Sequence, residues 1–159
     1  MTYAMPAGRD ALADLRILVV EDELLVAMLV EEMLQELGCK VVQTTSTVGE
    51  SIAAVRQHHL DGALLDGNLS GENSSPVADE LLGRAVPFLL VTGYAGRDGD
   101  SPALKMAPRL KKPFVIDELA DRMVEVFGRG QRHETEAGNS GNCKTLLAST
   151  ESGDYRTFR

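Results

Sequence analysis

Residues 16–23 read Arg-Ile-Leu-Val-Val-Glu-Asp-Glu, an apolar run that ends in three consecutive acidic residues. Because its apolar residues do not alternate with polar ones, the run predicts a strand of a parallel sheet that is covered on both faces. Similar short runs follow at 39–44, 62–65, 87–92 and, more weakly, 109–111. Segments with the period of a helix separate them. This alternation predicts an α/β fold with a parallel sheet.

The segment after the first strand has the clearest helical pattern, and it stops at Gly38, a favourable residue for ending a helix. Three further apolar residues, Leu24, Leu25 and Met28, lie beside its main apolar stripe. They are either partly buried under loops or form a docking face for the helices of a partner protein. The stripe itself has i, i+3, i+4 and i+7 spacing and is predicted to face the sheet; it consists of Val26, Leu29, Val30, Met33, Leu34 and Leu37.

Further helices are predicted at 48–58, from Pro76 onward, and at 116–127. One more helix would be expected after the fourth strand. Residues 96–102 are typical of a loop instead, and only 103–107 favour a short helical turn.

The chain has 159 residues, 43% of them hydrophobic and 25% charged, which is typical of one globular domain. Its net charge of −8 argues against nucleic acids or anionic membranes as partners, because their phosphates would be repelled. The longest apolar run, residues 24–30, is far shorter than the roughly 18 residues of a membrane span, and no secretory signal is visible. Cys39 and Cys143 are too few for a disulfide framework or a zinc site, so we expect a cytoplasmic protein.

The sequence is expected to divide into an N-terminal extension at 1–13, a main domain at 14–128 and a C-terminal tail at 129–159. The tail is dominated by polar residues and glycines. A segment of this size and composition cannot bury a core of its own, so we predict that it is disordered.

Polar side chains follow four of the predicted strands. In an open parallel sheet the carboxyl ends of the strands form the functional edge, so these side chains should meet in one crevice. The set comprises three carboxylates, a hydroxyl and an ammonium group: Glu21, Asp22, Asp66, Thr92 and Lys112.

Three crowded carboxylates repel one another and favour a bound divalent cation, and oxygen ligands of this kind suit Mg²⁺. A carboxylate held beside Mg²⁺ can attack a phosphoryl group and form an acyl phosphate. Lys112 would neutralise charge on the transferring oxygens, and Thr92 could donate a hydrogen bond to one of them.

Four motifs occur in the order and spacing of the receiver domain of bacterial two-component response regulators, and over about 14–128 the sequence resembles that family. They are Leu-Val-Val-Glu-Asp-Glu (18–23), Leu-Leu-Asp-Gly-Asn-Leu (64–69), Val-Thr-Gly-Tyr (91–94) and Lys-Pro-Phe (112–114). The fold to be expected is a flavodoxin-like, doubly wound sheet of five parallel strands in the order 2-1-3-4-5. Helices would cover both faces, with the fourth helix short or irregular.

The resemblance also implies roles for individual residues. Asp66 would accept a phosphoryl group from a sensor histidine kinase or a histidine phosphotransfer protein, and Thr92 and Lys112 would contact that group. Glu21, Asp22, Asp66 and the backbone carbonyl of Asn68 would hold Mg²⁺. Without an output domain in this sequence, we expect a stand-alone receiver that signals through a downstream protein partner; a homodimer through the last two strands and the last helix is left open.

Two positions depart from the family pattern. Receivers commonly carry an aromatic switch residue three positions before the lysine, where this sequence has Arg109, and a proline four positions after the phosphorylated aspartate, where it has Ser70. The sequence therefore resembles a group of single-domain regulators that lack the aromatic residue. Our hypothesis is that phosphorylation orders residues 93–108 instead of turning a ring.

Two other functions remain open. One is a Mg²⁺-dependent phosphatase or phosphotransferase of the haloacid dehalogenase type, which also uses an aspartate nucleophile. Such enzymes need a second aspartate two positions later, where this sequence has Asn68. The other is a receiver-like binding module that is never phosphorylated, although such a module would be expected to lack part of the polar set. We therefore expect a phosphorylatable signalling domain and not an enzyme.

Overall fold

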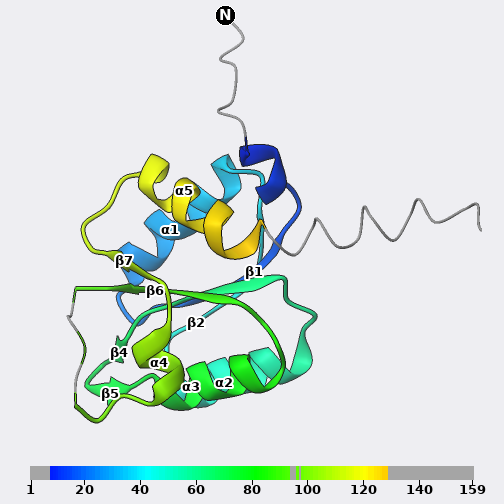
Figure 1. Cartoon of the computed structure of the whole chain (residues 1–159). Helices are drawn as coiled ribbons and strands as arrows, with labels where there is room; N and C mark the ends of the chain where they lie inside the picture. Colours follow the sequence, from blue (N-terminus) through cyan, green and yellow to red (C-terminus); the bar gives the residue numbers. More distant parts are fainter. Residues whose placement is uncertain (1–7, 94–95, 97, 129–159) are drawn as a thin grey trace, which may run out of the picture.

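The computed structural model describes residues 8–93, 96 and 98–128. Its centre is a parallel sheet of five strands in the order β2-β1-β3-β6-β7 (Figure 1). Once the strands of a small separate hairpin are left out of the numbering, this is the predicted order 2-1-3-4-5. The strands are β1 (Arg16–Val20), β2 (Lys40–Thr45), β3 (Gly62–Leu65), β6 (Phe88–Thr92) and β7 (Arg109–Lys111).

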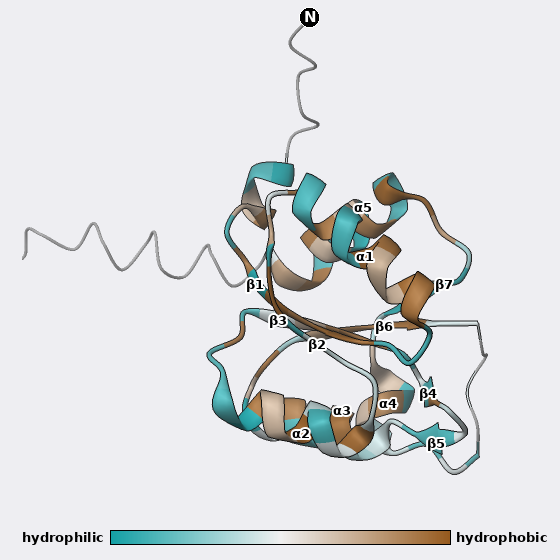
Figure 2. Ribbon diagram, turned by 180° about the vertical axis from the view of Figure 1, so that it is seen from behind, coloured by the Kyte–Doolittle hydropathy of each residue, from teal (hydrophilic) through white to brown (hydrophobic). Residues whose placement is uncertain are grey.

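Helices cover both faces of the sheet, as expected for a doubly wound fold (Figure 1). On one face lie α1 (Leu24–Glu36) and α5 (Ile116–Phe127), and on the other lie α2 (Val48–Gln57), α3 (Ser75–Gly83) and α4 (Pro102–Met106). Each face has its own apolar cluster of strand and helix side chains. In the ribbon coloured by hydropathy, the central strands are largely hydrophobic, whereas the helices combine hydrophilic and hydrophobic residues (Figure 2). None of the helices in the described part of the chain has the length and apolarity that a membrane span requires.

The fourth helix of the main fold, α4, has only five residues, as predicted. The Ser101 side chain caps it by accepting a hydrogen bond from the Leu104 amide, and Pro102 opens the first turn. Its single fully buried residue, Leu104, anchors the helix on the sheet. The helix ends before Pro108 because the residue before a proline disfavours helical backbone angles.

The structure corrects the predicted stripe of α1 at one position. Leu29 is 50% exposed, and the smaller Ala27 is buried instead. Leu24, Leu25 and Met28 are also exposed. Together with Leu29 they form an apolar surface at the start of α1, which we call the α1 surface. The prediction that Leu24, Leu25 and Met28 are partly buried under loops is therefore wrong.

Two elements were not predicted. A 3₁₀ helix, η1 (Arg9–Leu12), lies in the stretch predicted as an extension, and its Leu12 is fully buried in the same cluster as the apolar residues of α5. The second element is a hairpin of β4 (Asn68–Leu69) and β5 (Glu72–Asn73). The predicted domain boundaries remain predictions, and the predicted tail lies outside the described residues.

Candidate functional site

The parallel sheet brings the predicted polar side chains to one edge. Val20 pairs with Leu65 in register, and Thr92 pairs with Lys111. Leu65 also pairs with Leu90, two residues before the end of β6, so the chain leaves all four strands at the same edge of the sheet. Glu21 and Asp22 leave β1, Asp66 leaves β3, Thr92 closes β6, and Lys112 leaves β7.

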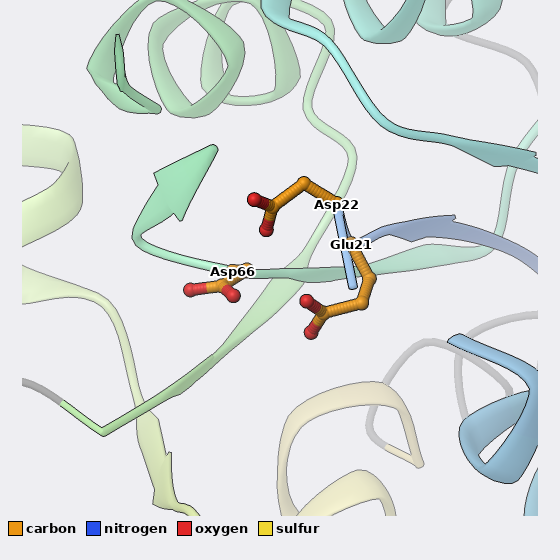
Figure 3. Close-up of side chains that lie close together, drawn as sticks. All are labelled: Glu21, Asp22 and Asp66. Carbon is orange, nitrogen blue, oxygen red and sulfur yellow. The ribbon is translucent and has the colours of Figure 1, made fainter. Parts of the chain in front are cut away.

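The three carboxylates converge on one point (Figure 3). Glu21, Asp22 and Asp66 each offer an oxygen atom, and these atoms lie within 4.8 Å of one another. Glu21 and Asp66 are buried, and Asp22 is half-buried. Three carboxylate oxygens at this spacing form a hard, negatively charged donor set, which fits Mg²⁺ better than a transition metal.

Lys112 reaches across the edge of the sheet to two of these carboxylates. Its Nζ donates hydrogen bonds to Glu21 Oε2 at 2.5 Å and to Asp66 Oδ2 at 2.9 Å. Burial alone would lower the pKa of the Lys112 ammonium, but these two hydrogen bonds outweigh it and raise the pKa above its ordinary value. The ammonium therefore stays charged at neutral pH and offsets part of the carboxylate charge.

The carboxylates differ in their surroundings. Burial raises the pKa of Glu21, against the hydrogen bonds from Lys112 and from the Glu23 amide. Burial would also raise the pKa of Asp22, but hydrogen bonds from Ser70 bring it below its ordinary value. Asp66 accepts a hydrogen bond from the Asn68 amide on Oδ1 at 3.1 Å. Its two oxygens therefore face different donors, the Asn68 amide and Lys112.

Thr92 lies beside the chain that follows Asp66. It is 3% exposed, and a Cβ added to Gly67 would lie 3.3 Å from its Oγ1. Gly67 thus leaves room for the hydroxyl at the edge where the carboxylates meet. A small cavity of about 20 Å³, roughly the space that one water occupies, is lined by Gly67, Thr92 and Arg109, among others.

Arg109, at the position of the missing aromatic residue, directs its guanidinium towards α4. Nη2 donates a hydrogen bond to the Leu104 carbonyl at 3.3 Å. The guanidinium therefore holds the last turn of a short helix whose end carbonyls would otherwise lack partners.

The sequence did not reveal one residue at the site. Ser70, in the turn of the β4–β5 hairpin, donates two hydrogen bonds to Asp22, although the two residues are 48 positions apart. The dipeptide Ser70-Gly71 is a turn signal that the sequence did contain. It predicts a turn but gives no indication of which strand end the turn would approach.

Comparison with known proteins agrees with the fold and with the acidic pocket. The family model for the response regulator receiver domain matches residues 17–124. The chain belongs to this family. Receiver domains are signalling domains that are usually not enzymes, and they bind Mg²⁺ at an acidic pocket; this receiver has such a pocket in Glu21, Asp22 and Asp66.

Among curated proteins, the receiver is similar to the transcriptional regulatory protein PdtaR of Mycobacterium tuberculosis, with 28% identity over 69% of this chain and 55% of that one. Among solved structures it is similar to SdrG from Sphingomonas melonis Fr1, with 40% identity, a TM-score of 0.60, and coverage of 71% and 94% of the two chains. It also resembles the receiver domain of the sensor histidine kinase PA1611 from Pseudomonas aeruginosa, a structure with magnesium coordinated in the active site cleft. That match has 26% identity, a TM-score of 0.60, and coverage of 71% and 96%.

The chain spans about half the length of the curated relatives that it matches. The family model covers residues 17–124, so the family likeness concerns the receiver domain. The functions of the remaining parts of those proteins are not transferred to this chain.

Proposed function

We propose that this receiver accepts a phosphoryl group on Asp66 from a sensor histidine kinase or a histidine phosphotransfer protein, in a reaction that depends on Mg²⁺. The observation that carries the proposal is the position of Asp66. The Asp66 side chain is 10% exposed, shares the ammonium of Lys112 with Glu21, and has a carboxylate oxygen within 4.8 Å of oxygens from two other acidic groups. A buried carboxylate with a cation on one side and an acidic pair on the other suits attack on a phosphoryl group.

In the proposed transfer, an Asp66 carboxylate oxygen forms a bond to phosphorus while the bond from phosphorus to the donor's nitrogen or oxygen breaks. The donor keeps the bonding electron pair. Lys112 Nζ already lies 2.9 Å from Asp66 Oδ2, so it can neutralise negative charge on one of the transferring oxygens. The Thr92 hydroxyl would donate a hydrogen bond to another of these oxygens. Glu21, Asp22, Asp66 and the Asn68 carbonyl would hold Mg²⁺, which supplies charge neutralisation when bound.

The phosphatase alternative is weaker because of the residue two positions after Asp66. A repeated catalytic cycle needs a group there that gives and takes a proton. The amide of Asn68 does neither at neutral pH. We therefore expect one slow cycle of phosphorylation and hydrolysis instead of turnover.

Incubation with Mg²⁺ and acetyl phosphate, followed by intact-mass measurement, tests the proposal. We expect one added phosphoryl group per chain, and none when Mg²⁺ is chelated or in Asp66→Ala. A parallel assay with a generic phosphate ester should give no sustained release of phosphate. Steady turnover of the ester would favour the phosphatase, and the absence of any phosphorylated chain would favour the pure binding module.

We assign the α1 surface to the phosphoryl donor. Leu24 and Leu25 are 73% and 80% exposed, and the helix that carries them begins two residues after Asp22. An apolar surface so close to the pocket suits the helices of a kinase or phosphotransfer protein. Replacing Leu25 and Met28 together by Glu should slow phosphotransfer from the cognate donor and leave phosphorylation by acetyl phosphate unchanged. Unchanged kinetics with the cognate donor would rule out this assignment.

Signalling is proposed to act on residues 93–108 and not on an aromatic ring, since Arg109 stands in the ring's place. Two contacts link the chain after Asp66 to the start of α4: Asn73 Nδ2 donates to Asp100 Oδ1 at 2.7 Å, and the Ser101 amide donates to Ser75 Oγ at 2.9 Å. They offer a path from Asp66 to α4 that needs no aromatic residue. If amide exchange at 93–108 did not change on phosphorylation or on binding beryllofluoride, the hypothesis would be wrong.

The remaining expectations stay predictions. They are a cytoplasmic location, signalling as a stand-alone receiver through a downstream protein partner, and a homodimer through β6, β7 and α5. Their support is the family to which the chain belongs, and none of them affects the chemistry proposed for Asp66.

A further inference from the structure

The turn of the β4–β5 hairpin has an unusual backbone. Ser70 has φ of 53° and Gly71 has φ of 88°, so both residues of the turn lie in the left-handed region. Two-residue hairpin turns of this kind favour Asn-Gly or Gly-Gly, because a residue with a side chain other than Asn or Asp is strained there. A serine at the first position is therefore not explained by the turn alone.

The Ser70 side chain contacts the acidic pocket. Its hydroxyl donates to Asp22 Oδ2 at 2.9 Å, and its backbone amide donates to the same oxygen at 2.8 Å. Two donors from one residue on a single oxygen fix the rotation of the carboxylate. The residue with the strained backbone is thus the one that contacts the pocket, and strained residues tend to cluster at functional sites.

We propose that Ser70 is a positioning residue that holds the Asp22 carboxylate in the orientation needed to bind the divalent cation. The inference rests on the proposed function, since it takes Asp22 as a ligand of that cation. Groups that hydrogen-bond to a metal ligand restrict its motion before the metal arrives, and removing them typically weakens metal binding by 10- to 100-fold. The amide of residue 70 would remain in any variant, so the expected loss is smaller, about 3- to 10-fold.

A purely structural role for Ser70 makes the opposite prediction for one substitution. Ser70→Gly removes the hydroxyl and also relieves the left-handed strain, so the hairpin should be at least as stable as in the wild type. If Ser70 served only the turn, Ser70→Gly would bind Mg²⁺ as well as the wild type. If it positions Asp22, binding weakens although stability does not.

The experiment is a titration of the full chain with MgCl₂, in which the amide chemical shifts of residues around the pocket report binding. Urea unfolding without Mg²⁺ measures the stability of the same proteins. The variants are Ser70→Ala, which keeps the strain, and Ser70→Gly, which removes it. Ser74→Ala is the matched control, because Ser74 lies just after the hairpin at the start of α3, and its buried hydroxyl has no hydrogen-bond partner among the described residues.

We expect a Mg²⁺ dissociation constant raised about 3- to 10-fold in both position-70 variants and unchanged in Ser74→Ala. Unchanged or tighter binding in Ser70→Gly would overturn the inference and leave the proposed function intact. A wild type whose pocket amides do not respond to Mg²⁺ at all would instead contradict the proposed function, and the inference with it.

Discussion

We predict that Lys112 neutralises the carboxylates of the pocket when Mg²⁺ is not bound. Its removal should therefore make the stability of the fold depend on Mg²⁺. The Lys112 side chain is 20% exposed, whereas those of Glu21 and Asp66 are 5% and 10% exposed. Lys112→Met keeps the length of the side chain but leaves two buried carboxylates without their shared cation. Breaking a buried ion pair from one side costs about 3 to 5 kcal/mol. The partial exposure of Lys112 places the expected loss near the lower end, about 3 kcal/mol.

Added Mg²⁺ should recover much of that loss. A ligand present at 100 times its dissociation constant stabilises the folded state by about 2.7 kcal/mol. In the wild type the ion must compete with Lys112 for Asp66, so the same concentration should stabilise the wild type less than the variant. The difference in stability between the two proteins should therefore shrink as Mg²⁺ increases.

Urea unfolding with and without Mg²⁺ measures both quantities. Lys111→Met is the matched control, since Lys111 is the exposed neighbour of Lys112 and should change stability little. A Lys112→Met protein as stable as the wild type without Mg²⁺ would refute the reasoning. So would a difference in stability that Mg²⁺ does not change.

Three further predictions concern the fold. Gly62→Ala should destabilise the domain by about 1 to 3 kcal/mol in urea unfolding, because the added Cβ would lie 2.6 Å from a ring carbon of Phe127; a variant of unchanged stability would show that this contact yields freely. Cys39 is buried and burial raises the pKa of its thiol to about 11, so peptide mapping after alkylation of the native protein near pH 8 should find it unmodified, and rapid modification would contradict its placement. Hydrogen bonds from two arginines lower the pKa of Glu80 from 4.5 to about 2, so its carboxylate stabilises the fold above pH 4.5 and that contribution is lost as the pH falls towards 2. Glu80→Gln should flatten the fall in stability over that range, and an identical pH dependence in both proteins would count against the ion pairs.

The sequence predicted the parts of the fold that follow from regular patterns. β3 and α5 have the predicted bounds, because a short apolar run and a long helical period are strong local signals. The stripe of α1 was wrong at Leu29 because the pattern ranks residues by apolarity, whereas close packing against the sheet selected the smaller Ala27. The hairpin strands have two residues each, which is too short for any periodic signal.

The same distinction applies to the site. Parallel strands must bring their carboxyl ends to one edge, so the meeting of Glu21, Asp22, Asp66 and Lys112 could be predicted from the order of the elements. Their roles in phosphotransfer remain predictions. The contact of Ser70 with Asp22 could not be predicted, because it depends on the direction in which a short turn folds back across the sheet edge.

The central claim is that the Asp66 carboxylate forms an acyl phosphate, and its most direct test is chemical. Borohydride reduces an aspartyl phosphate to homoserine, so peptide sequencing by mass spectrometry after treatment with Mg²⁺, acetyl phosphate and borohydride identifies the residue that reacted. We predict homoserine at position 66, only when both Mg²⁺ and the phosphodonor are present. An unreduced Asp66, or homoserine at another aspartate instead, would contradict the account.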